Sequence, residues 1–181
     1  MSVTFVPDTN IGDYFKGLDI RFRSNDEFAN YYEKIFSKGC KNITFIVTRD
    51  CNLRCTYCYE KHKENYAMSF ETAKKAVDFL FEEDEKQTVI INNKDADCII
   101  LEFIGGEPLI EIKLIDKILD YFVDKAISLN HRWARNFLIS MSSNGVLYFS
   151  KDVQDFLHKY EGKFSMNISI DGNKQLHDKC R

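Results

Sequence analysis

The chain has 181 residues, of which 44% are hydrophobic and 29% charged, and its 25 basic and 28 acidic residues leave a net charge of −3. This composition is typical of a globular protein with enough apolar material for a core. The charge balance argues against nucleic-acid binding. No apolar run approaches the ~18 residues that span a bilayer, and the N-terminal MSVTFVPDTN lacks the features of a signal peptide. We therefore expect a cytoplasmic protein with no membrane or nucleic-acid partner.

The first 41 residues are the least informative part of the sequence. Asp26–Phe36 has helical spacing of apolar residues, and Gly39 follows at a position where a helix would end. We expect residues 1–41 to form a short helical extension, followed by a domain of residues 42–181.

From Ile43 onward, apolar strand-like runs alternate with amphipathic helical patterns. This alternation predicts parallel βαβ units and thus an α/β fold, whose strands end at one common edge. Proteins of this class place their chemistry at that edge. The predicted strands are residues 43–48, 98–104, 137–142 and 163–170. The predicted helices begin at a Ser69 cap, near Glu111 and near Lys151. The loops expected at the common edge are residues 50–60, 105–108, 143–145 and 171–172.

In each predicted strand, every second residue falls on the same face of the sheet, and one of the two faces carries polar residues. These include Thr44, Glu102, Ser140 and Asn167. A closed, packed barrel prefers Val, Ile and Leu inside. We therefore favour a polar interior that accepts a ligand over the alternative, an ordinary half-buried sheet with one face toward solvent.

The loop after the first strand holds three of the six cysteines, Cys51, Cys55 and Cys58, in a Cys-x3-Cys-x2-Cys pattern. Thiolates at this spacing suit an iron–sulfur cluster or zinc. Three cysteines would leave one iron of a four-iron cluster open, as a catalytic site requires. His62 offers a fourth ligand for zinc, so both interpretations stand at this point. Among the other cysteines, we expect Cys98 to be a buried thiol and assign no role to Cys40 or Cys180.

The second strand ends in the run Gly105-Gly106-Glu107-Pro108. Two glycines let the backbone approach a ligand closely, and Glu107 supplies an acceptor for an ammonium group. Alone this run could be a tight turn before a helix. One βα unit after a three-cysteine loop, it is a specific signal and favours the iron–sulfur interpretation.

Together these motifs resemble those of the radical S-adenosylmethionine (radical SAM) superfamily. The resemblance is carried by CNLRCTYC, GGEP, SSNG (142–145) and SIDG (169–172), and it covers residues 42–181. The run SIDGNKQLHDKCR resembles the branch of anaerobic sulfatase maturases and SPASM-type radical SAM peptide maturases. The resemblance implies an α/β chain that forms the first four βα units of a partial (β/α)6 TIM-like barrel. It also implies that the chain is truncated, with the fourth strand an uncapped edge; the alternative is a partner chain that completes the sheet.

The resemblance further implies two cofactors, a [4Fe–4S] cluster and SAM, and their ligands. Cys51, Cys55 and Cys58 would bind three irons, and SAM would chelate the fourth. Tyr57 would lie by the adenine, or only pack under the loop. Gly105, Gly106 and Glu107 would receive the methionine amino group, and Asn144 and Ser169 would lie near the ribose and carboxylate. For Asn144 a left-handed turn before Gly145 is the alternative. His177 and Asp178 are expected to be surface residues or to cap the next helix. Arg181 is expected to be exposed, with a contact to an anionic group at the edge as the alternative.

The activity implied is one-electron reductive cleavage of SAM to a 5′-deoxyadenosyl radical that abstracts hydrogen from a peptide or protein substrate. Flavodoxin or ferredoxin would donate the electron, and auxiliary clusters would lie beyond Arg181. An alternative within the family is a cofactor-maturation enzyme. An alternative of another class is a zinc-binding structural or interaction module that uses Cys51, Cys55, Cys58 and His62.

Overall fold

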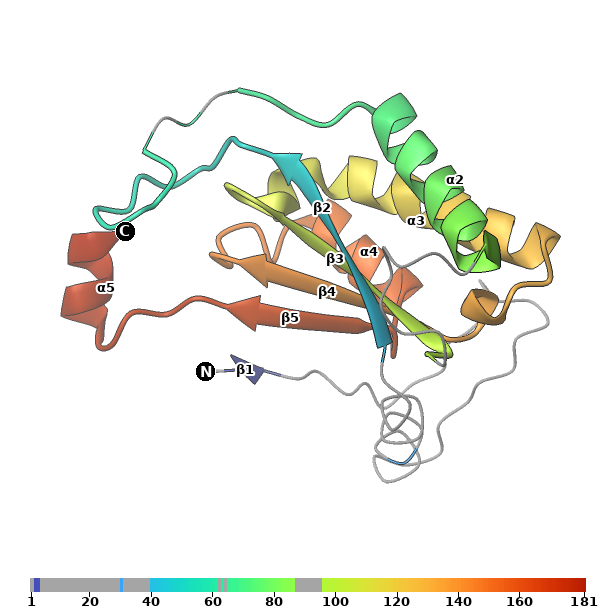
Figure 1. The fold of residues 1–181 in the computed structure, drawn as a ribbon. Coiled ribbons are helices and arrows are strands. Elements are labelled where there is room, and N and C mark those ends of the chain that lie inside the picture. The colour runs from blue at the N-terminus through green and yellow to red at the C-terminus, as the bar shows by residue number, and fades with distance from the viewer. Residues whose placement is uncertain (1, 4–29, 31–39, 62, 64, 87–95) are drawn as a thin grey trace.

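A computed structural model describes residues 2–3, 30, 40–61, 63, 65–86 and 96–181 (Figure 1). The predicted helix over Asp26–Phe36 lies outside the described residues except for Asn30, and His62 lies outside them as well. The division at residue 41 stays a prediction.

Four parallel strands, as the alternating pattern predicted, and one short antiparallel strand form the sheet. The parallel strands are β2 (Cys40–Thr48), β3 (Cys98–Gly105), β4 (Phe137–Ser143) and β5 (Phe164–Ile168), and they lie in the order β5-β4-β3-β2. β2 begins three residues earlier than Ile43 because Cys40–Asn42 pair with β3. The fourth strand was predicted to be an uncapped edge. This is wrong for part of the strand, because β1 (Ser2–Val3) pairs antiparallel with Asn167 and Met166 of β5.

The helices follow local signals in the sequence. α2 (Phe70–Lys86) begins after Ser69, whose Oγ accepts a hydrogen bond of 3.1 Å from the Thr72 N–H. Pro108 opens the 3₁₀ helix η2 (Pro108–Glu111), where its missing N–H costs nothing, and α3 (Ile112–Ser128) continues from it. The remaining elements are η3 (Arg132–Ala134), α4 (Lys151–Lys159) and α5 (Lys174–Cys180).

α2, α3 and α4 cover one face of the sheet and bury its apolar residues (Figure 1). The strand register places Phe45, Phe103, Met141 and Met166 side by side on this face. All four are buried, and the rings of Phe45 and Phe103 stack with centroids 5.4 Å apart. Each such burial contributes about 1.5–3 kcal/mol, so this layer supplies much of the stability of the fold.

The opposite face of the sheet carries the polar residues, and none of the helices in the described part of the chain packs across it (Figure 1). The register aligns Thr44, Glu102, Ser140 and Ser165 in one row across four strands. Within this row the Thr44 hydroxyl donates to Oε2 of Glu102 over 2.7 Å. The sequence therefore placed the polar positions on the correct common face; that this face lines a ligand-binding interior stays a prediction.

At the amino end of the same face, Cys98 is fully buried, as predicted, and packs with Leu138, Cys40 and Ile100. Burial raises the pKa of the Cys98 thiol, which keeps it protonated and unreactive. This end of the sheet is opposite the loops that hold the conspicuous motifs.

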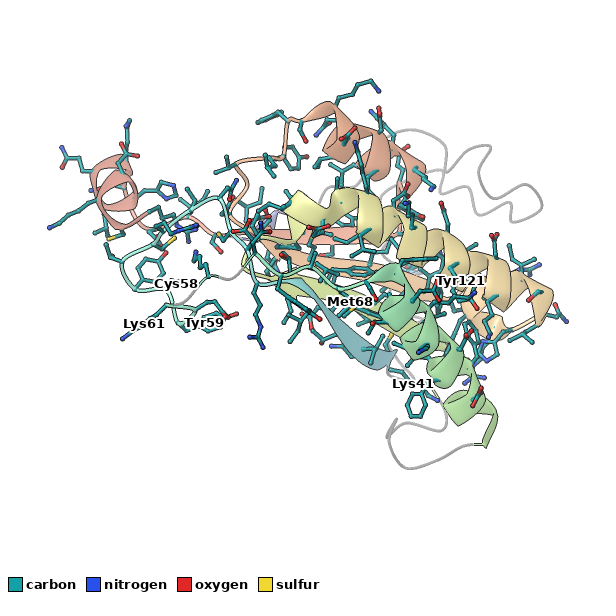
Figure 2. The ribbon with its side chains drawn as sticks, turned by 90° about the horizontal axis from the view of Figure 1, so that it is seen from above. Lys41, Cys58, Tyr59, Lys61, Met68 and Tyr121 are labelled. Carbon is teal, nitrogen blue, oxygen red and sulfur yellow. The ribbon has the colours of Figure 1, made fainter. Side chains whose placement is uncertain are left out.

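All four loops after the parallel strands lie at the carboxyl edge of the sheet. Figure 1 shows the cysteine loop and α5 together at that end, away from the three packed helices. Figure 2 places Cys58, Tyr59 and Lys61 beside α5, whereas Met68 and Tyr121 lie by the helical layer. Among the described residues, no helix has the length and apolar character needed to cross a membrane.

Candidate functional site

The base of the cysteine loop is fixed to the Gly-Gly-Glu turn at the end of β3. Gly106 N–H donates to the Thr48 carbonyl over 3.1 Å, and Glu107 N–H donates to the Asp50 carbonyl over 2.9 Å. A Cβ on either glycine would lie 2.3 Å from one of these carbonyl oxygens. Glycine is therefore required here because the main chain of the loop approaches closely. The sequence had predicted close approach to a ligand instead; that further role of Gly105 and Gly106 stays a prediction.

The first cysteine of the loop is buried and receives N–H groups at its sulfur. Cys51 is 6% exposed, and its Sγ lies 3.4 Å from the Leu53 N and 3.8 Å from Nδ2 of Asn144. The Asn144 amide also donates to Oδ1 of Asn52 over 2.7 Å, which fixes its direction. Donors aimed at sulfur stabilise a thiolate and tune a metal bound to it. These contacts suit a thiolate at Cys51, and its role as a cluster ligand stays a prediction.

The other two cysteines lie on the outer half of the loop and are partly exposed. Cys58 N–H donates to the Cys55 carbonyl over 3.1 Å, so the chain turns between them. Among the described residues, no three His, Cys, Asp or Glu side chains converge in a metal-binding group, and cluster binding would have to draw the sulfurs together. Because His62 is outside those residues, the Cys3His zinc set stays untested.

Glu107 is buried at the centre of the edge and ties three segments together. It is 1% exposed. Its Oε1 accepts from the Ser143 hydroxyl at 2.8 Å and from the Leu109 N–H at 3.1 Å, and its Oε2 accepts from the Asn144 N–H at 2.8 Å. A carboxylate has about four acceptor positions, so one remains for an ammonium group. The predicted contact with the methionine amino group stays a prediction, but the structural role of Glu107 is evident.

Replacing Glu107 by glutamine should destabilise the protein by about 1.5–3 kcal/mol, the range for a hydrogen bond to a buried charged group. In either orientation the new amide nitrogen faces a backbone N–H, that of Leu109 or that of Asn144. Urea unfolding would measure the change. Glu102→Gln is the matched control because Glu102 is only partly buried. Equal stability of the two variants would contradict the proposed arrangement.

Asn144 makes a turn and also contacts the cysteine loop, while its predicted place near SAM stays a prediction. Its Oδ1 accepts from the Val146 N–H at 2.9 Å, which makes the turn, while its Nδ2 reaches the cysteine loop. The expected left-handed conformation of Asn144 is wrong: Gly145 carries it, with φ of +78°. A glycine takes this conformation without the Cβ clash that Asn144 would suffer.

Tyr57 lies on the outer half of the loop and contacts the C-terminal segment. Its hydroxyl donates to Asp171, and Arg181 Nε donates to the same Asp171 oxygen over 2.7 Å. The Arg181 guanidinium lies 5.9 Å from the centre of the Tyr57 ring. Arg181 holds the pKa of Asp171 below its usual range, and the bond to Asp171 raises the pKa of Tyr57. Of the two expectations for Arg181, exposure is wrong, since its side chain is 10% exposed, and the alternative contact with an anionic group is the one found.

Ser169 follows β5 and is exposed at the same edge, where its N–H donates to the Ser143 carbonyl over 3.0 Å. Its predicted role near the SAM ribose or carboxylate stays a prediction. Sequence reasoning missed Ser143 and Asn52 and read Asp171 only as a turn residue. Ser143 lies within the SSNG motif, so its place beside Glu107 is the one contact that the motif order could have suggested.

The family model of the radical SAM superfamily matches residues 45–181 of this chain. The match covers most of the chain, and the chain therefore belongs to the radical SAM superfamily. Motifs, fold and family model agree on the α/β half-barrel as its architecture.

Three relatives give the range of similarity. An uncharacterized protein of Methanocaldococcus jannaschii is 35% identical over 74% of this chain and 40% of its own length. The cysteine-type anaerobic sulfatase-maturating enzyme of Clostridium novyi is 33% identical over 78% of this chain and 36% of its own. The AdoMet-dependent heme synthase of Nitratidesulfovibrio vulgaris is 31% identical over 80% and 34%, respectively. The chain thus spans two fifths or less of the length of these relatives.

The solved structure of native anSMEcpe with bound AdoMet matches the fold with a TM-score of 0.57. The two sequences are 23% identical, and the match covers 77% of this chain and 34% of that one. This likeness supports the arrangement of strands and helices and nothing finer.

The family cofactors are a [4Fe–4S] cluster and SAM, and the residues at the edge of the sheet fit them. Three thiols lie on one loop, N–H groups point at the Cys51 sulfur, and the base of the loop is fixed to the Gly-Gly-Glu turn. Soft thiolate ligands with N–H donors around them are the setting that iron–sulfur clusters require.

Proposed function

We propose that this chain provides the cofactor-binding half of a radical SAM enzyme that cleaves SAM reductively and modifies a peptide or protein. The observation that carries the proposal is the joined geometry of two motifs. The Gly-Gly-Glu backbone holds the base of the cysteine loop through bonds of 3.1 and 2.9 Å, while Asn144 donates to the Cys51 sulfur.

In this proposal Cys51, Cys55 and Cys58 hold the cluster. When bound, the cluster and SAM supply one-electron cleavage to a 5′-deoxyadenosyl radical, which abstracts hydrogen from the substrate. The protein orients them. Tyr57, 56% exposed, offers a ring face to the adenine, and the Gly105–Glu107 turn offers acceptors to the methionine amino group.

Asn144 and Ser169 are assigned to the ribose and carboxylate side of SAM. Both lie at the carboxyl edge of the sheet, on the loops after β4 and β5, and Ser169 is exposed there. Their positions support this assignment because SAM would have to extend from the cysteine loop across those two strand ends.

A peptide or protein substrate is supported by the similarity to the sulfatase-maturating enzyme and by the polar row on the open face of the sheet. Thr44, Glu102 and Ser140 lie below the edge and offer hydrogen-bonding groups to a polar chain. A low-potential donor such as flavodoxin or ferredoxin would supply the electron. The similarity to a heme synthase favours the second candidate, a cofactor-maturation enzyme.

The test uses the full natural chain, purified without oxygen and reconstituted with iron and sulfide. With SAM and dithionite it should release 5′-deoxyadenosine and methionine, and without dithionite it should not. A protein that binds four irons per chain yet releases neither product would refute the proposal. A colourless protein that binds zinc would instead support the zinc-binding alternative.

The substrate class is tested by the same preparation. Peptides encoded near the gene and a porphyrin precursor serve as the two probes, and mass spectrometry reports the loss of hydrogen or the formation of a new bond. A mass change in the peptide alone supports the peptide assignment, and a change in the porphyrin alone overturns it.

A further inference from the structure

Two segments far apart in the sequence lie against each other at the carboxyl edge. Thr56 N–H, in the cysteine loop, donates to the Cys180 carbonyl over 2.8 Å, and the Thr56 hydroxyl lies 3.5 Å from the same oxygen. Next to it, the Tyr57 hydroxyl donates to Asp171, 114 residues away. Figure 2 shows α5 beside the part of the loop that carries Cys58. We call residues 171–181 the C-terminal strap.

The strap is internally fixed, so it can hold another segment in place. Asn173 Oδ1 accepts from the Leu176 N–H at 3.0 Å and caps α5. The Asp171 N–H donates to Nδ1 of His177 over 3.3 Å, and the Arg181 N–H donates to the His177 carbonyl over 3.0 Å. These bonds cap the short helix at its start, join its middle to the turn after β5 and fix Arg181 at its end.

Asp171 is the point where the strap and the loop meet. One carboxylate oxygen, Oδ2, accepts both from Arg181 and from the Tyr57 hydroxyl. A charged acceptor shared by two donors gives stronger bonds than a neutral one. Arg181 in turn lies over the Tyr57 ring, so the tyrosine is held at its hydroxyl and at its face.

Thr56 and Tyr57 are the two residues between Cys55 and Cys58. A contact that fixes both residues also fixes the outer two cysteines relative to β5. The inner cysteine, Cys51, is held separately, by Asn144 and by the turn after β3. The loop is therefore held at two points that come from different strands.

We propose that Asp171 is a positioning residue that holds the Cys55–Cys58 half of the loop in the form that retains the cluster. This inference rests on the proposed function for the identity of the cluster. It assigns a role to the strap that the motif resemblance does not contain, because the strap acts on the protein loop and not on SAM.

The decisive comparison is between Asp171→Ala and Asp178→Ala in the full natural chain. Asp178 lies in the same strap, within α5, but it is exposed, and among the described residues its ion pair is with Lys174 of the same helix. In cluster-loaded protein, Asp171→Ala should lose iron to a chelator about tenfold faster than wild type, as expected when bonds to a charged group are removed. Asp178→Ala should match wild type, and both should share one thermal midpoint.

A double-mutant cycle tests whether Asp171 acts on iron retention through its bond to Tyr57 or independently of that bond. Tyr57→Phe removes the hydroxyl and keeps the ring. Because both substitutions remove the same bond, the double variant should lose iron no faster than Asp171→Ala alone. If the fold-increases of the two single variants multiply in the double variant, the two residues act independently, and the proposal is overturned.

A second measurement does not depend on the cluster. In metal-free protein, trypsin should cleave after the exposed Lys61 about tenfold faster in Asp171→Ala than in Asp178→Ala. If wild type binds the cluster but both assays treat the two variants alike, the positioning role is wrong and the proposed function stands. If wild type binds no cluster, the proposed function fails and trypsin alone decides the role of the strap.

Discussion

Cys55→Ala should remove essentially all cluster iron from the reconstituted protein. The loop supplies three thiolates, and a cluster held by only two would leave two irons open to water and oxygen. Because the ligands themselves bind the metal, we expect affinity to fall by well over the ~10–100-fold typical of changes to residues that only hydrogen-bond to a ligand. Iron and sulfide content, together with visible absorbance after anaerobic reconstitution, would measure the loss, and production of 5′-deoxyadenosine should stop.

Two controls make this result specific. Cys98→Ala should keep the colour, because Cys98 is buried at the amino end of the sheet, opposite the loop. His62→Ala should also keep it, whereas in the zinc-binding alternative His62 is a ligand and its loss would weaken metal binding. A Cys55→Ala protein that still binds four irons would contradict the assignment of the loop.

The sequence predicted the order of strands and helices because the signals for them are local. Alternating apolar runs, the Ser69 cap and Pro108 act over a few residues, and all appear where expected. The pairing of Ser2 and Val3 with β5 was missed because such a short strand has no pattern of its own. It exists only because Asn167 and Met166 present free backbone groups 160 or more residues later.

The parts of the candidate site that lie within one sequence motif could be predicted. The contacts between residues that are far apart in the sequence could not. The cysteine loop and the Gly-Gly-Glu turn were identified from residue type and order. The link from Tyr57 to Asp171 could not be, because neither residue type indicates a partner 114 positions away. For Arg181 exposure was favoured over contact with an anionic group because most arginines are exposed, but the turn after β5 brings the Asp171 carboxylate to it.

Gly105 and Gly106 have a structural role that the sequence analysis did not predict. Their expected role was to admit a ligand, yet the nearest atoms to a Cβ at Gly106 belong to the protein. They are the Asp50 carbonyl oxygen at 2.3 Å, its carbon at 2.7 Å and the Arg49 oxygen at 2.8 Å. All three are main-chain atoms, so no side-chain rotation could relieve the contact. The loop that carries the cysteines would have to move instead.

Gly106→Ala should therefore displace the base of the cysteine loop and lower cluster occupancy severalfold. The movement would break the 2.9 Å bond from Glu107 N–H to the Asp50 carbonyl. Together with the steric cost, this should destabilise the chain by about 2–4 kcal/mol. Urea unfolding measures the stability, and iron content after reconstitution measures the occupancy.

Gly162→Ala separates local displacement from general destabilisation. Gly162 has φ of +74° between α4 and β5, at the edge of the sheet opposite the loop. An alanine there should cost about 1–2 kcal/mol through backbone strain. Because it does not touch the cysteine loop, it should leave iron content unchanged. If Gly106→Ala instead retains as much iron as Gly162→Ala, the glycine does not set the position of the loop, and the cluster site depends on the cysteines alone.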